Sequence, residues 1–223
     1  MGSRASHDEI ELKRRLIGAG AADKLVAVLG PVAVLKRQIN HVFDTEDRRL
    51  NQQRYSVRLR LEDGTPVVTA KGPSRGVGAH TSSRTEAEAE IESTLADEIL
   101  AGRGDPVAGL RERETDRAYD ELWRGLDQAR DGRPLRAVGH FENQRRTVPV
   151  VLPSGLALTV EVDRTRFPDG RVDDEIEIEV PSDDVVSEVE AWLDERAAAA
   201  GVTIGPSRSK VGRFFAALRG AVR

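Results

Sequence analysis

Charged and apolar residues alternate along several segments of the chain, which is the pattern of β-strands with one polar and one apolar face. In residues 7–15 and 174–180, Glu alternates with Ile or Leu. Six further segments also predict strands: 38–45, 55–61, 66–71, 81–92, 140–152 and 156–164. The turn sequences Glu-Asp-Gly-Thr at 62–65 and Pro-Ser-Gly at 153–155 predict two hairpins among them.

Apolar residues at helical spacing predict helices at residues 21–30 and 185–200, and a last amphipathic helix that starts near Ser207. Residues 93–130 predict two helices, broken at the Gly- and Pro-containing stretch 101–106. Eight mainly antiparallel strands are enough to close into a barrel that holds one small ligand. We therefore predict an α+β fold: an eight-stranded antiparallel β-barrel with flanking helices. It forms a single domain over residues 1–223, with a helical insertion at about 93–130.

The composition excludes several kinds of chemistry. The 223 residues include no cysteine, which rules out disulfides, thiol catalysis and zinc–thiolate sites. No apolar run approaches the roughly 20 residues of a membrane helix, so we predict a cytoplasmic protein with no membrane partner. The net charge is −4 and aromatic residues make up 4%, which argues against nucleic acid as a partner. The chain also lacks a P-loop, a dinucleotide-binding fingerprint and paired histidines at metal-ligand spacing.

The charges are arranged in rows of one sign. Glu9 and Glu11, Glu86 and Glu88, and the glutamates of 175–179 each lie two residues apart, roughly 6.6 Å along a strand. Arg58 and Arg60 form a similar row of positive charge. A solvated outer face is the common explanation for an alternating strand. Rows without intervening opposite charges favour instead an interior with acidic and basic walls, which suits a triphosphate bound together with a divalent metal.

The ordered motifs resemble the CYTH domain, a group of triphosphate tunnel metalloenzymes related to adenylate cyclase and thiamine triphosphatase. Glu9-Ile-Glu-Leu-Lys13 matches the family's opening ExExK signature. It is followed by Phe-Asp-Thr at 43–45, Arg-Leu-Arg at 58–60, Thr-Ala-Lys at 69–71, Arg-Thr-Glu-Ala-Glu at 84–88 and Ser-Lys at 209–210. One departure is Asn143, where the family commonly has Lys in a Lys-x-Arg pair. The resemblance then implies that Arg145 is the retained cation, and we expect Arg146 to point outward.

The resemblance implies a tunnel that binds a triphosphate with Mg²⁺ or Mn²⁺, and it assigns roles to individual residues. The implied metal ligands are Glu9, Glu11, Glu86, Glu88, Glu161, Asp163, Glu177 and Glu179. The implied phosphate ligands are Lys13, Arg15, Arg58, Arg60, Lys71, Arg84, Arg145 and Lys210. The implied catalytic residues are Glu9, Glu11, Lys13 and Lys71.

These residues predict a metal-dependent triphosphatase that cleaves the terminal phosphoanhydride of a triphosphate. Tripolyphosphate is preferred over thiamine triphosphate or a nucleoside triphosphate, because few aromatic residues are present to stack an organic group. Two alternatives remain open. The same residues would serve an adenylate cyclase that makes cAMP from ATP, and the departure at Asn143 leaves room for a non-catalytic polyphosphate-binding module.

Overall fold

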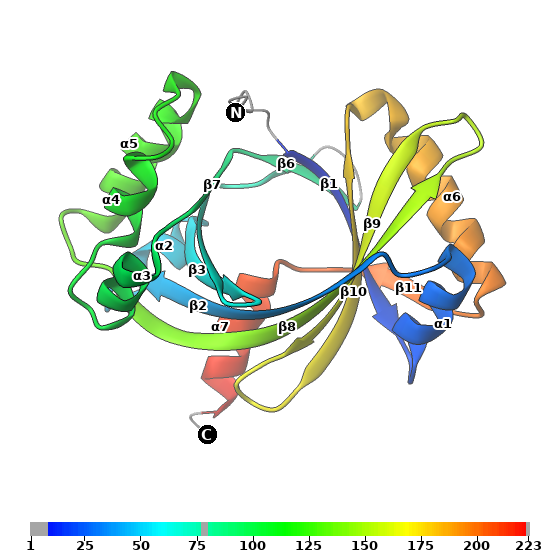
Figure 1. Ribbon diagram of the computed structural model, residues 1–223, viewed down its shortest axis with the longest axis horizontal. Helices are drawn as coiled ribbons and strands as arrows, with labels where there is room; N and C mark the ends of the chain where they lie inside the picture. The colour runs from blue at the N-terminus through cyan, green and yellow to red at the C-terminus, as the bar shows by residue number, and fades with distance from the viewer. Residues whose placement is uncertain (1–8, 77–79, 222–223) are drawn as a thin grey trace. The chain divides into compact units, whose positions relative to one another are not determined.

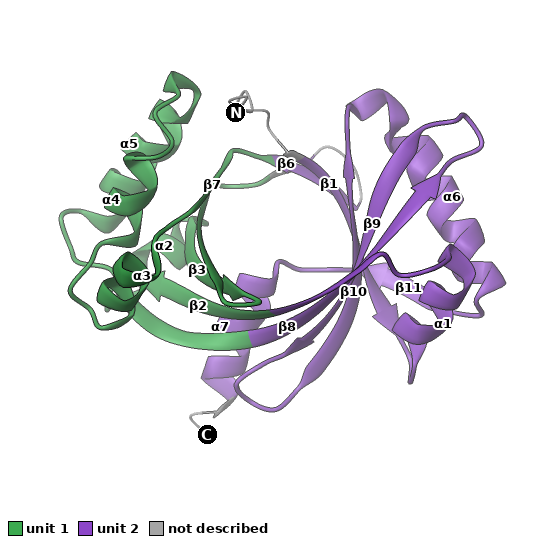
Figure 2. Ribbon diagram, in the orientation of Figure 1, with its two compact units in different colours: residues 1–8, 38–75, 84–141 green, residues 9–37, 76–83, 142–223 purple. Residues whose placement is uncertain are grey.

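The computed structural model describes residues 9–76 and 80–221, except for the side chains of Glu9, Arg75 and Ala221. The chain divides into two compact units, which are coloured separately in Figure 2. Of the described residues, unit 1 comprises 38–75 and 84–141, and unit 2 comprises 9–37, 76, 80–83 and 142–221. The long strands β2 (Val34–Asp44) and β8 (Arg136–Val151) each contribute residues to both units.

Unit 1 is an antiparallel sheet with helices packed on one face. Its strands follow the order β2, β3 (Ser56–Glu62), β4 (Thr65–Lys71) and β7 (Glu86–Glu90). Asp63 and Gly64, both at positive φ, form the two-residue turn between β3 and β4, as expected of a type I′ hairpin. The unit also holds the 3₁₀-helix η1 (Arg117–Tyr119). Its α-helices, labelled in Figure 1, are α2 (Arg49–Gln52), α3 (Ser93–Leu100), α4 (Pro106–Arg111) and α5 (Asp120–Arg130).

The apolar face of this sheet forms the core of unit 1. Val57, Leu59 and Val68 from the strands pack with Leu110 and Leu126 from the helices, and all five are fully buried. The strands alternate, so Arg58 and Arg60 lie on the opposite face. The helices therefore cover the apolar face and leave the charged face free of that core.

Unit 2 is also an antiparallel sheet with helices packed on its apolar face, but one further helix contacts its charged face. β1 (Glu9–Ile17), β10 (Val172–Val180), β9 (Ala157–Arg166) and most of β8 follow one another, and all of these pairs are antiparallel. The short strand β11 (Thr203–Pro206) pairs with β1. The helices are α1 (Ala21–Leu29), η2 (Asp183–Val185), α6 (Val186–Ala199) and α7 (Lys210–Ala221). Leu12, Ile176 and Val162 from the strands pack with Leu25 and Leu193 from α1 and α6.

The predicted α+β class with antiparallel strands and flanking helices is confirmed. The described part of the chain contains eleven strands rather than eight. Residues 81–92 divide at Thr85 into β6 (Thr81–Arg84) and β7, and the short strands β5 (Arg75–Gly76) and β11 have too few residues to show a period. Helices occupy much of 93–130, with α4 and η1 as additional turns. The single-domain boundary remains a prediction.

None of the helices in residues 9–76 and 80–221 is both long enough and apolar enough to cross a bilayer.

Candidate active site

Strand register brings the charged rows of unit 2 together on one face. β1 and β10 place Lys13 opposite Glu177 and Arg15 opposite Glu175. β9 and β8 continue these rows, because Glu175 lies opposite Asp163 and Asp163 lies opposite Arg145. Side chains at directly opposed positions point to the same face of a sheet. Residues distant in the sequence thus form one polar surface, on the side of the sheet away from the apolar core.

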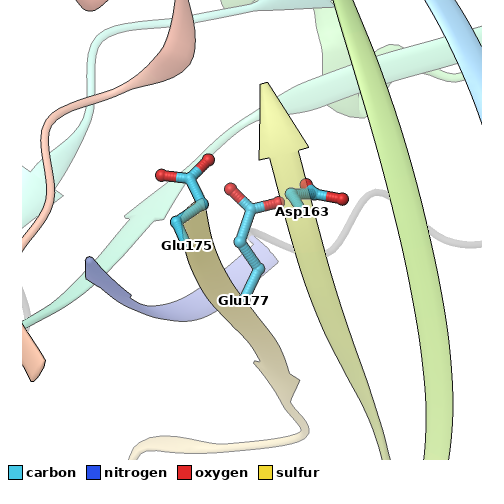
Figure 3. Close-up of side chains that lie close together, drawn as sticks. All are labelled: Asp163, Glu175 and Glu177. Atoms are coloured by element: carbon cyan, nitrogen blue, oxygen red, sulfur yellow. The ribbon is translucent and has the colours of Figure 1, made fainter. Parts of the chain in front are cut away.

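Three carboxylates at the centre of this surface form the carboxylate cluster: Asp163 from β9 with Glu175 and Glu177 from β10 (Figure 3). One oxygen of each lies within 4.8 Å of one oxygen of the others. Asp163 and Glu175 are fully buried, and Glu177 is 5% exposed. Carboxylates buried in this way require compensating positive charge.

Lys210, the first residue of α7, supplies part of that charge. Its Nζ lies 2.6 Å from Asp163 Oδ2, 2.5 Å from Glu175 Oε1 and 2.7 Å from Glu177 Oε1. One ammonium group therefore contacts every member of the carboxylate cluster, and the start of α7 is fixed beside it. Lys210, which the resemblance implied as a phosphate ligand, therefore lies beside the acidic strands of unit 2.

Arg145 and Lys13 contact the same cluster from the strands. Arg145 donates through Nε and Nη2 to the two oxygens of Asp163, at 2.9 and 2.7 Å, and through Nη2 to Glu177 at 2.8 Å. Arg145 is also ion-paired with Glu161. Lys13 Nζ lies 2.6 Å from Glu177 and 3.2 Å from Glu11. Planar guanidinium groups and ammonium groups of this kind are the usual ligands of phosphate oxygens.

Burial and charge together set the pKa values of these groups. Burial disfavours the charge on Glu177, but Lys13, Lys210 and Arg145 outweigh it and hold the pKa of Glu177 well below its usual range. Burial likewise opposes ionisation of Asp163, whereas Lys210 and Arg145 lower its pKa. Glu161 differs, because burial raises its pKa to about 7 against the opposing effect of Arg145.

The positive groups shift in the complementary direction. Burial disfavours the charged forms of Lys13 and Lys210, yet the surrounding carboxylates raise the pKa of both. Coulombic attraction to Asp163 similarly outweighs burial and raises the pKa of Arg145. Asp163, Glu177 and the three cations are therefore charged at neutral pH, whereas the pKa of Glu161 lies near neutrality.

Sequence reasoning missed an outer set of residues around the cluster. Arg213 Nη1 lies 3.0 Å from Asp173, and its other nitrogen Nη2 is ion-paired with Glu175. Arg15 also contacts Asp173, at 2.7 Å. Glu175 and Asp173 share the parity of Glu177, and Arg213 follows Lys210 by one helical turn. Those two spacings are the signals by which these residues could have been found.

Unit 1 carries a second set of charges on its helix-free face. Arg60 Nη2 donates to Glu88 Oε1 at 2.8 Å, and Thr69 Oγ1 donates to Glu88 Oε2 at 2.7 Å. Arg58 Nη2 donates to Thr69 at 3.4 Å. At the end of β4, Lys71 is ion-paired with Glu86. This set, like that of unit 2, joins cations to carboxylates across neighbouring strands.

The remaining predicted site residues are Glu179, Arg84 and Glu9. Glu179 is exposed at the end of β10 and lies outside the carboxylate cluster. Arg84 ends β6 and is half-buried. Glu9 begins β1, but its side chain lies outside the described part. Arg146 points away from the polar face and pairs with Asp23 of α1 at 2.7 Å, as the sequence predicted.

The CYTH domain profile matches residues 7–215, which is nearly the whole chain. The chain belongs to the CYTH family. Members of this family are metal-dependent enzymes that act on triphosphate-containing substrates. None of the curated proteins compared with the chain matches it.

Solved structures agree with this membership. A Hippeastrum protein described as an adenylyl cyclase candidate with a dominant triphosphatase activity is 26% identical, with a TM-score of 0.72, and the match covers 93% of this chain and 95% of that one. A proposed adenylate cyclase from Bacillus halodurans is 21% identical, with a TM-score of 0.66 and coverage of 93% and 98%. The PH1819 protein from Pyrococcus horikoshii is 18% identical, with a TM-score of 0.53 and coverage of 96% and 99%. The Bacillus and Pyrococcus structures show likeness of fold alone. The matches together confirm the predicted fold class.

The donor set of this CYTH protein fits a hard divalent metal. The carboxylate cluster offers only oxygen atoms, which Mg²⁺ and Mn²⁺ prefer over nitrogen or sulfur. Its negative charges are already balanced by Lys210 and Arg145, so a metal would share these carboxylates with cations of the chain. The departure at Asn143 does not disturb the cluster, because this buried side chain accepts a hydrogen bond from Thr165 Oγ1 at 2.9 Å.

Proposed function

We propose that this CYTH protein is a metal-dependent triphosphatase that hydrolyses the terminal phosphoanhydride of tripolyphosphate. The observation that carries the proposal is the contact of Lys13, Arg145 and Lys210 with Glu177, at 2.6 to 2.8 Å. The three cations that contact this buried carboxylate can bind phosphate oxygens in its place. A site for a plain anion would have no use for carboxylates, whereas a site for a metal-bound triphosphate needs both signs.

The residues of the chain have separable roles in this proposal. Lys13, Arg145 and Lys210 bind the oxygens of the transferred phosphoryl group and stabilise the charge that develops during attack by water. In unit 1, the phosphate ligands are Arg58, Arg60, Lys71 and Arg84. Arg15, near the end of β1, is a phosphate ligand whose exposed side chain contacts Asp173 in the structure.

Carboxylates hold the divalent ion. Asp163 and Glu177 belong to the carboxylate cluster, and we add its third member, Glu175, to the predicted metal ligands. The other proposed ligands, from the sequence pattern, are Glu9, Glu11, Glu86, Glu88, Glu161 and Glu179. When bound, Mg²⁺ or Mn²⁺ neutralises phosphate charge and polarises the bond to the leaving group.

Arg145→Lys and Arg146→Lys form a matched pair for the test. Both arginines belong to β8, but only Arg145 lies on the polar face with Asp163 and Glu177. Lysine cannot reproduce the bidentate contact of arginine. With tripolyphosphate and Mg²⁺, Arg145→Lys is expected to lower kcat/KM by about 100-fold, whereas Arg146→Lys stays within about two-fold. Equal activity of the two variants would contradict the proposed roles.

Substrate and reaction are tested on the unmodified protein. Phosphate release from tripolyphosphate, ATP and thiamine triphosphate is measured with Mg²⁺, with Mn²⁺ and with chelator, and the ATP reaction is assayed for cAMP. Metal-dependent release that is fastest on tripolyphosphate is the expected result. Accumulation of cAMP would favour the cyclase, and tight tripolyphosphate binding without turnover would favour a binding module.

A further inference from the structure

Asn40 is a fully buried carboxamide without a hydrogen-bond partner in the described part of the chain. The side chain is 1% exposed, and neither Nδ2 nor Oδ1 is bonded. A carboxamide offers two N–H donors and one acceptor oxygen. Buried side-chain polar atoms are bonded in the large majority of cases, so an orphaned amide calls for an explanation.

The strand register places Asn40 on the charged face of unit 1. Asn40 lies opposite Arg60, and the next position of the same face, Val42, lies opposite Arg58. The Cβ atoms of directly opposed residues are typically about 5 Å apart. The amide therefore lies beside two arginines that we have proposed as phosphate ligands, on the face away from the helices.

The neighbouring amide of the same strand is different. Gln38, two residues earlier on the same face, is 4% exposed and donates through Nε2 to Glu62 Oε2 at 2.7 Å. A buried side-chain amide on this face can therefore form a hydrogen bond within the protein, as Gln38 does, whereas Asn40 forms none with the described residues. This contrast gives an internal control for the role of Asn40.

We propose that Asn40 is a further substrate-binding residue, whose Nδ2 donates to a phosphate oxygen of the triphosphate bound by Arg58 and Arg60. The inference rests on the proposed function, because it takes the same triphosphate as the ligand. An uncharged amide is suited to this position, since it adds a donor without repelling phosphate as Glu88 or Glu62 would. Its Oδ1 accepts from a donor that accompanies the substrate, such as a water molecule.

Asn40→Leu and Gln38→Met test the proposal as a pair of near-isosteric substitutions. Affinity for tripolyphosphate is measured by calorimetry with chelator, KM is measured with Mg²⁺, and stability is measured as the urea midpoint. Asn40→Leu is expected to weaken binding by about ten-fold or more. Its urea midpoint should be equal to or above that of the unmodified protein, because an unsatisfied polar group is removed. Gln38→Met should lower the urea midpoint and leave affinity within about two-fold, because it breaks a bond within the protein.

Each other result has a defined meaning. Unchanged affinity in Asn40→Leu overturns the proposal, and so does a urea midpoint that falls as in Gln38→Met, since the amide would then serve the fold. Asn40→Asp keeps the size but replaces donors with negative charge, so it should bind tripolyphosphate more weakly than Asn40→Leu; tighter binding overturns the proposal. If the unmodified protein neither binds nor hydrolyses tripolyphosphate with Mg²⁺, the proposed function fails as well, whereas normal KM and turnover of Asn40→Leu with Mg²⁺ reject only the role of Asn40.

Discussion

Replacing Lys210 by Met tests how far the carboxylate cluster depends on a cation of the chain. The ammonium contacts Asp163, Glu175 and Glu177 at 2.5 to 2.7 Å, and all three carboxylates are buried. Methionine keeps much of the volume but removes the charge. Removal of one partner from a buried ion pair costs about 3–5 kcal/mol. We expect a loss near 3 kcal/mol, because Arg145 still contacts two of the three carboxylates.

Urea unfolding at pH 7.5 with chelator measures this loss. With a dependence of about 2–3 kcal/mol per molar urea, a loss of about 3 kcal/mol lowers the midpoint by about 1–1.5 M. Lys24→Met, at an exposed position of α1, is the control and should leave the midpoint almost unchanged. Adding Mg²⁺ should recover part of the loss in Lys210→Met, because a ligand that binds only the folded state stabilises it. Equal midpoints for the two variants would refute the reasoning.

The pH dependence of the same variant follows from the carboxylates. Burial opposes their charge, but neighbouring cations hold the pKa values of Asp163 and Glu177 below normal. Their stabilising effect is therefore complete above the pKa of an unfolded carboxyl group, about 4, and is lost as the pH falls below that value. The stability difference between Lys210→Met and the unmodified protein should be largest near neutral pH and shrink toward pH 3. A constant difference over that range would show that charge is not its cause.

Two further predictions concern the stability of unit 1. Asp44 is buried and accepts three backbone N–H bonds, at 2.7 to 3.0 Å, around the start of α2. Asp44→Ala should therefore lower the free energy of unfolding, measured by urea titration, by about 3 kcal/mol. Asp97→Ala, at an exposed position, is the control. Burial, with a smaller effect of His140, lowers the pKa of His41, so the unfolded state binds that proton more readily and stability should fall as the pH drops below about 6.5. His41→Gln should reduce this decline in stability. If the free energy of unfolding depends on pH in the same way in this variant as in the unmodified protein, His41 is not its cause.

In the strands that alternate, such as β1, the two-residue period was enough to predict which face is charged. Lys13 and Glu11 share a parity in residues 7–15, and the structure places both on the polar face of β1. Which carboxylate meets which cation depends on strand register and on the position of α7, and neither is encoded locally. Glu175, Glu177 and Glu179 therefore look equivalent in the sequence, although only Glu175 and Glu177 join the cluster with Asp163.

Two short strands and the unpaired amide of Asn40 could not be predicted from the alternation of residues. β5 and β11 have 2 and 4 residues, so their strand conformation comes from pairing with neighbours rather than from alternation. Asn40 lies in a segment correctly predicted as a strand, but an orphaned amide is a property of its three-dimensional surroundings. The sequence alone gives no reason to separate it from Gln38.

The ion pairs of the polar face are better explained by binding than by stability. Well-packed apolar residues in place of a buried ion-pair network often leave a protein equally or more stable. Unit 2 already has an apolar core on the other face of its strands, where Leu12, Ile176 and Val162 pack under α1 and α6. Folding therefore does not require Asp163 and Glu177 to be charged and buried. Buried carboxylates held ionised by lysine and arginine are what a site for a metal-bound triphosphate requires, because the same groups must bind metal and phosphate when the substrate arrives.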